Sequence, residues 1–180
     1  MTARETPAQR RERRGAVDDP AVVLETAAAF LAVRPRSIEE TRRRLRHLGY
    51  RHELVEAVVE RLLGLGYLDD ATFARAWVES RDRARPRGEN ALRRELSLKG
   101  VERPVVDEIL AERTASSGGT EPDEAAARAL LERRRQALAR EPDPRRRRQK
   151  AYALLARHGF DPQTCASVAA TVAEPPVDTD

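Results

Sequence analysis

A glycine-centred pattern occurs three times along the chain and constrains the fold more than any other feature. Gly49, Gly100 and Gly159 lie 51 and 59 residues apart, and apolar residues stand at four matched offsets around each of them. Glycine accepts the left-handed backbone conformation that ends helices, and an apolar residue often follows it. The matched residues are Leu45, Leu96 and Leu155, then Tyr50, Val101 and Phe160, then Val55, Val106 and Cys165, and finally Val58, Ile109 and Val168. The pattern predicts three copies of one helical unit.

Helix start signals divide each copy into three helices. Asp19 before Pro20 is a capping side chain followed by a proline at the first helical position, and Ser37 with Glu40 forms a capping box. The same signals return as Asp69 with Asp70, Asp143 with Pro144 and Asp161 with Pro162. We expect an all-α fold of nine helices, in three tandem three-helix repeats that form an elongated, curved array.

The predicted boundaries follow these signals. We expect a disordered Arg-rich tail over 1–18, repeats over 19–66, 67–115 and 122–174, a flexible linker over 116–121 where the sequence reads SSGGT, and a second disordered tail over 175–180.

Composition narrows the classes of protein. Aromatic residues make up 4% of the chain, which leaves little material for a β-sandwich or barrel. No stretch approaches the roughly 18 apolar residues of a membrane span, and the amino terminus lacks the apolar segment of a signal peptide. We therefore expect a cytoplasmic, monomeric protein with no membrane contact.

No residues with catalytic or metal-binding spacing are visible. Cys165 is the single cysteine and has helical spacing to apolar neighbours, so we interpret it as buried. The histidines, which are His47, His52 and His158, are scattered among arginines and are expected to be solvated. Asp69 and Asp70 precede a helix, which favours a capping role over catalysis. We expect no catalytic residue, no cofactor and no metal.

The basic residues are the candidates for binding. The chain has 34 basic and 30 acidic residues, and residues 133–150 alone hold nine basic and two acidic residues. Arginine pairs with both carboxylates and phosphates through its planar fork, so a band of exposed arginines suits a protein partner or a nucleic acid. The alternative is a solvated helix face. The candidates are Arg42, Arg43, Arg46, Arg93, Arg94, Lys99, Arg133, Arg134, Arg145, Arg146, Arg147, Arg148 and Lys150.

Two segments of the middle repeat carry a resemblance to a known family. GYLDDATFA at 66–74 and RGENALRRELSLKGV at 87–101, with Arg81 between them, are similar to the signature of the RecX family, regulators of the RecA recombinase. Most of this motif we interpret as structural, with core side chains at Tyr67, Leu68, Phe73, Leu92 and Leu96.

The resemblance implies tandem three-helix repeats and a non-enzymatic activity. RecX-like proteins bind the RecA nucleoprotein filament and restrain its ATPase, strand-exchange and co-protease functions. The partners implied are therefore the RecA filament and, with it, single-stranded or duplex DNA.

Two other functions fit a helical-repeat protein. The first is a DNA-binding protein built from helix-turn-helix-like triplets, although no helix has the Asn, Gln and Arg pattern of base recognition. The second is a passive scaffold, which would have more uniform repeats and no local excess of positive charge.

Overall fold

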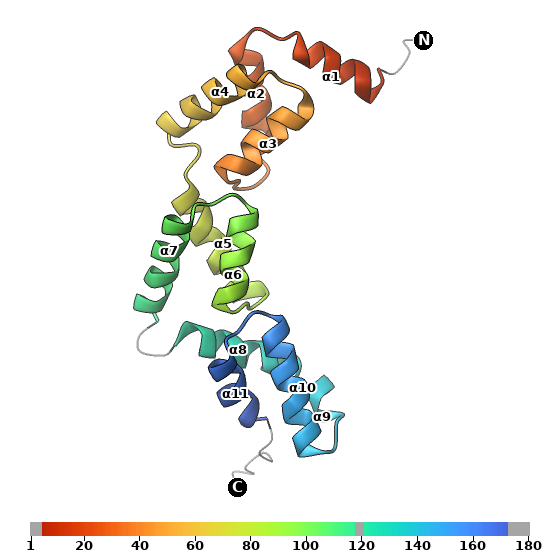
Figure 1. Cartoon of the computed structure of the whole chain (residues 1–180), viewed down its shortest axis with the longest axis vertical. Helices are drawn as coiled ribbons and strands as arrows, with labels where there is room; N and C mark the ends of the chain where they lie inside the picture. Colours follow the sequence, from red (N-terminus) through yellow and green to blue (C-terminus); the bar gives the residue numbers. More distant parts are fainter. Residues whose placement is uncertain (1–4, 118–120, 173–180) are drawn as a thin grey trace. The chain divides into compact units, whose positions relative to one another are not determined.

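The structure is a computed structural model that describes residues 5–117 and 121–172, and every regular element in these ranges is a helix (Figure 1). The helices are α1 (Pro7–Gly15), α2 (Pro20–Leu31), α3 (Ile38–Leu48), α4 (His52–Gly64), α5 (Asp70–Ala84), α6 (Glu89–Leu98), α7 (Arg103–Ala115), α8 (Pro122–Arg133), α9 (Arg135–Ala139), α10 (Pro144–Arg157) and α11 (Pro162–Ala170). The chain forms two compact units, one of Met1–Ala74 with Lys99–Glu102 and the other of Arg75–Leu98 with Arg103–Asp180.

The predicted glycine pattern is confirmed in all three repeats. Gly49, Gly100 and Gly159 have φ values of 103°, 80° and 84°, the left-handed region that favours glycine. Every one of the twelve apolar residues at the matched offsets is buried, with at most 7% of its surface exposed. The repeat is therefore one packing scheme used three times, in which a glycine ends the second helix and apolar residues on both sides of it enter the core.

Two of the triplets have separate, well-defined cores. In the first unit, Val23 and Ala27 of α2 pack with Leu45 of α3 and with Val55 and Val59 of α4. In the second unit, α8, α10 and α11 share a core whose fully buried members include Ala127, Leu155 and Cys165. Burial of Cys165 agrees with its interpretation as a small core residue, and burial also raises the pKa of its thiol.

Paired contacts hold the start of α3 and of α6. In the first unit, the Ile38 N–H donates to Asp70 Oδ1 at 2.9 Å, and Ser37 Oγ donates to the Lys99 carbonyl at 2.5 Å. In the second unit, the Glu89 N–H donates to Asp123 Oδ2 at 2.8 Å, and the Gly88 N–H donates to the His158 carbonyl at 3.1 Å. We call these groups the first joint and the second joint. Each satisfies a helix N-terminal amide that has no partner inside its own helix.

Four sequence predictions require correction. The tail predicted over 1–18 contains α1, which begins with a capping box of Thr6 and Gln9 and has Pro7 in its first turn. The nine expected helices allow one helix between the linker and Asp143, but that stretch is divided into α8 and α9 at Arg134. Tyr67 is 69% exposed and is not in the core. The remaining correction concerns the Asp69–Asp70 pair.

Asp69 and Asp70 cap two different helices. Asp69 Oδ1 accepts from the Ala71 N–H at 2.9 Å and caps the start of α5, as predicted. Asp70 accepts from Ile38 at the start of α3 instead, through the first joint. The prediction was wrong for Asp70 because sequence spacing shows only the nearest helix. The predicted linker falls partly, and the predicted tail at 175–180 wholly, outside the described residues.

Candidate basic interface

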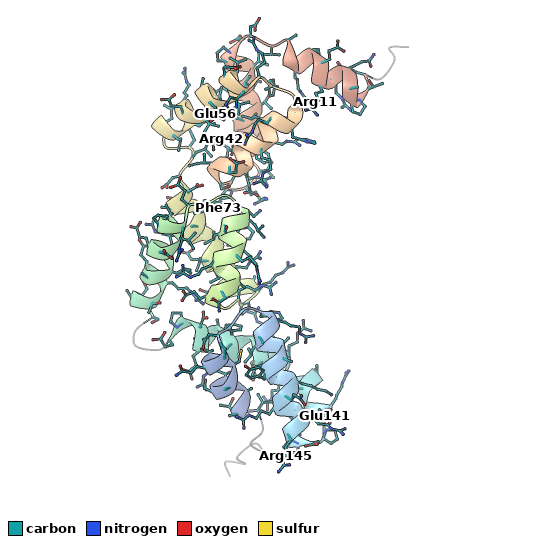
Figure 2. The ribbon with its side chains drawn as sticks, in the orientation of Figure 1. Arg11, Arg42, Glu56, Phe73, Glu141 and Arg145 are labelled. Carbon is teal, nitrogen blue, oxygen red and sulfur yellow. The ribbon has the colours of Figure 1, made fainter. Side chains whose placement is uncertain are left out.

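The three candidate arginines of α3 gather around one carboxylate. Arg42 Nη1, Arg43 Nε and Arg46 Nη2 lie 3.2, 3.9 and 2.9 Å from Glu39 carboxylate oxygens. Arg42 Nε also lies 2.9 Å from a carboxylate oxygen of Glu56 on α4, and Figure 2 labels both residues. Burial lowers the pKa of Arg42, but hydrogen bonds to Glu39 and Glu56 outweigh it and raise the pKa. Arg42 is thus a cross-link between two helices, and Arg43 is the most exposed of the three.

Arg93 of α6 repeats the arrangement of Arg42. Arg93 pairs with Asp107 of α7, and its Nη2 lies 2.8 Å from Glu89 Oε1. Arg42 and Arg93 are 51 residues apart, as are their partners Glu56 and Asp107, so the repeat includes an ion pair between its second and third helices. Arg94, the neighbouring candidate, is exposed and makes no side-chain hydrogen bond or ion pair within the described residues.

Lys99 is held within the first unit. Its Nζ donates to Glu40 Oε1 at 2.6 Å, beside the carbonyl through which Lys99 joins Ser37. Burial raises the pKa of Glu40, but the contacts with Lys99 and the Ser37 N–H outweigh it and lower the pKa. A positioning role is therefore a sufficient account of Lys99.

The two candidates that precede α10, Arg133 and Arg134, differ in whether other protein groups hold their side chains. Arg133 donates to the carbonyls of Ala84 and Arg83 at 2.5 and 2.7 Å, so it caps the carboxyl end of α5. Arg134 stands at the break between α8 and α9, is exposed, and has no side-chain hydrogen bond or ion pair in the described part of the chain.

The arginine run at the start of α10 is half engaged. Arg147 donates to the carbonyls of Glu141 and Pro142 at 3.0 and 3.4 Å, and Arg146 lies 3.7 Å from Asp143. Lys150 pairs with Glu141. Arg145 and Arg148 are exposed and, among the described residues, have no such partner.

The candidates therefore form two groups. Those with protein partners stabilise the fold, and they are Arg42, Arg46, Arg93, Lys99, Arg133, Arg146, Arg147 and Lys150. Those with little or no engagement are Arg43, Arg94, Arg134, Arg145 and Arg148, and they are spread over both units. The predicted basic band, which was expected to be discontinuous, thus has five members with little or no engagement by protein groups in the described residues.

The first unit also contains a basic groove that is not predicted from the sequence. An open groove of about 610 Å³ lies between α1 and α3 and is lined by Arg10, Arg11, Arg14, Arg44 and His47, together with three uncharged residues. Three of its arginines, Arg10, Arg11 and Arg14, fall in α1, in the segment that the sequence predicts to be a disordered tail. The capping box of Thr6 and Gln9 was the available signal for that helix.

The described residues contain neither a candidate metal cluster nor a candidate membrane-spanning helix. Residues 5–117 and 121–172 hold no cluster of three or more His, Cys, Asp or Glu side chains suited to a metal ion. None of the helices in those ranges is both long enough and apolar enough to cross a bilayer.

The helices and their basic side chains define a protein of three-helix repeats with exposed arginines. Family models match all three repeats: the first, second and third three-helix domains of RecX match residues 24–62, 69–110 and 122–168. The chain belongs to the RecX family.

Individual relatives agree with this assignment. The chain is 35% identical to the regulatory protein RecX of Prosthecochloris aestuarii over 81% of its own length and 90% of the relative. It is also 35% identical to the regulatory protein RecX of Mycobacterium avium, over 73% of each chain.

Solved structures show the same fold. The crystal structure of RecX from Lactobacillus salivarius matches with a TM-score of 0.71 at 18% identity, covering 86% of this chain and 97% of the other. A second crystal structure, of a regulatory protein RecX, matches with a TM-score of 0.70 at 21% identity, covering 92% and 78%.

Proposed function

We propose that this protein binds the RecA–DNA filament and modulates it, mainly by inhibiting ATP hydrolysis, strand exchange and co-protease activity. The observation that carries the proposal is the match of all three repeats to RecX domains, together with relatives named regulatory protein RecX. The protein would act in the cytoplasm, in recombinational DNA repair and the SOS response, without catalysing a reaction.

The exposed arginines supply a physical means of binding. Arg43 and Arg94 occupy equivalent positions in α3 and α6, and each stands beside an arginine that a third-helix carboxylate already holds. A regulator can thus keep one arginine for its own fold and present the next to an acidic or phosphate-bearing partner. Arg145 and Arg148 extend this supply in the third repeat.

Co-sedimentation tests whether the assembled filament is the target. We expect the chain to pellet with RecA filaments formed on single-stranded DNA in larger amounts than with the same DNA coated by an unrelated single-strand-binding protein. Changing Arg43 and Arg94 to Glu should reduce this pelleting, whereas changing the exposed Arg61 and Arg157 to Glu should not. Equal pelleting with both kinds of coated DNA would contradict a filament-specific regulator.

A further inference from the structure

The groove between α1 and α3 concentrates positive charge without compensating carboxylates. Arg10, Arg11 and Arg14 come from α1, while Arg44 and His47 come from α3. Within the described residues no acidic side chain lines the groove, and none of these five side chains makes an ion pair or side-chain hydrogen bond. The remaining arginine of α1, Arg13, does not line the groove, and its Nε lies 3.1 Å from Glu5 Oε1.

Local packing orients these arginines. A Cβ atom at Gly49 would lie 2.6 Å from Arg11 Cγ and 2.8 Å from the Arg11 carbonyl, so α1 lies directly against the glycine that ends α3. Figure 2 labels Arg11 on this helix. Arg44 has its guanidinium 5.8 Å from the centre of the Phe30 ring. The helical rise places Arg10 and Arg14 about 6 Å apart along the axis, which gives a row of charges rather than a single pocket.

The lining indicates the class of ligand. Among the described residues, the groove is lined by no Phe, Tyr or Trp side chain on which a base could stack and by no Asn or Gln to contact base edges. It also lacks the buried aromatic anchor typical of a protein interface. The apolar surface of the first unit lies elsewhere, in a groove lined by Leu24, Leu65 and Tyr67 among others. A row of guanidinium groups without base-reading partners matches the repeating phosphates of a nucleic-acid backbone.

We propose that the groove between α1 and α3 binds the phosphate backbone of a nucleic-acid strand without reading its sequence. This inference rests on the proposed function and deepens it, because it assigns the DNA of the RecA filament a contact site between α1 and α3. The site consists of Arg10, Arg11, Arg14 and Arg44, with His47 beside them in the lining.

The test measures DNA binding by the full chain in the absence of RecA. The groove variant carries Arg10→Gln, Arg14→Gln and Arg44→Gln and keeps Arg11, whose stem packs on Gly49. The control carries Arg61→Gln, Arg140→Gln and Arg157→Gln, which removes the same charge from exposed arginines without side-chain partners in the described ranges. Fluorescence anisotropy with a labelled oligothymidylate, and separately with a duplex, is recorded over a series of salt concentrations.

We expect the log–log salt slope for the single strand to fall by about two in the groove variant, at about 0.7 per phosphate contact, and to change little in the control. Lysine at the same three positions should preserve the slope. A larger change with the duplex would identify double-stranded DNA as the source of the phosphates. Circular dichroism checks folding, and no residue of α1 is buried, so the remaining core should be unaffected.

Three outcomes would overturn the inference. They are an unchanged slope in the groove variant, an equal change in the control, or binding of an acidic peptide in preference to both nucleic acids. The proposed function is contradicted by a different result, which is that the wild-type chain does not inhibit RecA. That result does not depend on the salt slopes of DNA binding. If the protein inhibits RecA but the salt slope of the groove variant is unchanged, only the proposed groove site is contradicted.

Discussion

The first joint and the second joint both pair an aspartate with the N–H group that begins a helix, but the ion pairs beside the two aspartates differ. In each, an aspartate at the start of a triplet's first helix accepts from the N–H that begins the preceding triplet's second helix: Ile38 with Asp70, and Glu89 with Asp123. Burial raises the pKa of both aspartates above the ordinary value, although the backbone N–H groups oppose this. The difference is Arg113, which donates to Asp123 at 2.7 Å, whereas no guanidinium lies within ion-pair distance of Asp70 in the described residues.

The comparison shows which part of the joint is general. The backbone recognition is common to both, because any second helix has free N–H groups at its start. The ion pairs differ between the joints. Arg113 contacts both Asp82 and Asp123 at the second joint, while Lys99 pairs with Glu40 near the first. A joint thus needs a carboxyl oxygen as acceptor at one position, and the neighbouring charges differ from one copy to the next.

The largest effect is expected from adding a Cβ atom at the second joint. In Gly159→Ala the new atom would lie 2.4 Å from Ala91 Cβ at a φ of +84°, so backbone strain and overpacking combine. We expect a loss of about 4 kcal/mol in the free energy of unfolding. Gly66→Ala is the matched control, because its φ is +73° with nothing within 4 Å, and it should lose about 1 kcal/mol. Denaturant unfolding measures both, and equal losses would show that Gly159 is required for its conformation alone.

The next largest effect should come from Arg113→Met. The Arg113 side chain is only 9% exposed, and its removal leaves Asp82 and Asp123 without their shared counter-charge. We expect a loss of about 3 kcal/mol in unfolding free energy. Lys99→Met at the first joint should cost about 1 kcal/mol, because Glu40 keeps its contact with the Ser37 N–H. A larger loss for Lys99→Met than for Arg113→Met would reverse the proposed difference between the joints.

The pH dependence of stability sharpens the description of the first joint. The pKa of Asp70 is raised on folding, mainly by burial. Protonation of Asp70 therefore contributes its full stabilisation at pH values below the ordinary pKa of 3.8. This contribution is lost as the pH rises through the raised pKa. Wild type should lose stability relative to Asp70→Asn over that interval. A relative gain by wild type in urea titrations at successive pH values would show that the folded joint prefers the carboxylate.

The smallest effect separates paired from exposed arginines. Arg93→Gln breaks partly exposed ion pairs with Glu89 and Asp107 and should lower the unfolding free energy by at most about 1 kcal/mol. Arg94→Gln should leave the free energy of unfolding unchanged and weaken binding to RecA filaments. A stability loss in Arg94→Gln equal to that in Arg93→Gln would remove the distinction between structural and binding arginines.

The fold could be predicted from the sequence where the information is local. The glycines, the apolar offsets and the caps at Asp19, Ser37 and Asp161 all act within a few residues of their positions, and the structure confirms them. Tyr67 was predicted to lie in the core, but a match to a family motif does not reveal whether a side chain faces the core. Asp70 was misassigned because its partner is 32 residues away.

The candidate site was less predictable for the same reason. Whether Arg42 or Arg43 is available depends on Glu56, which the sequence places on another helix but does not orient. Arg133 reads as part of a basic run, yet its partners are carbonyls at the end of α5. Predicting the groove from the sequence requires two facts, that α1 is a helix and that this helix packs against Gly49.

RecA-dependent ATP hydrolysis on preformed filaments tests the central claim most directly. The rate is measured as this protein is added at increasing ratios to RecA, with and without excess bare DNA. A filament regulator should slow hydrolysis while it is scarcer than RecA, and bare DNA should restore little of the rate. Inhibition that appears only at strand-saturating amounts and is fully reversed by competitor DNA would contradict the regulator and favour a protein that acts on DNA alone.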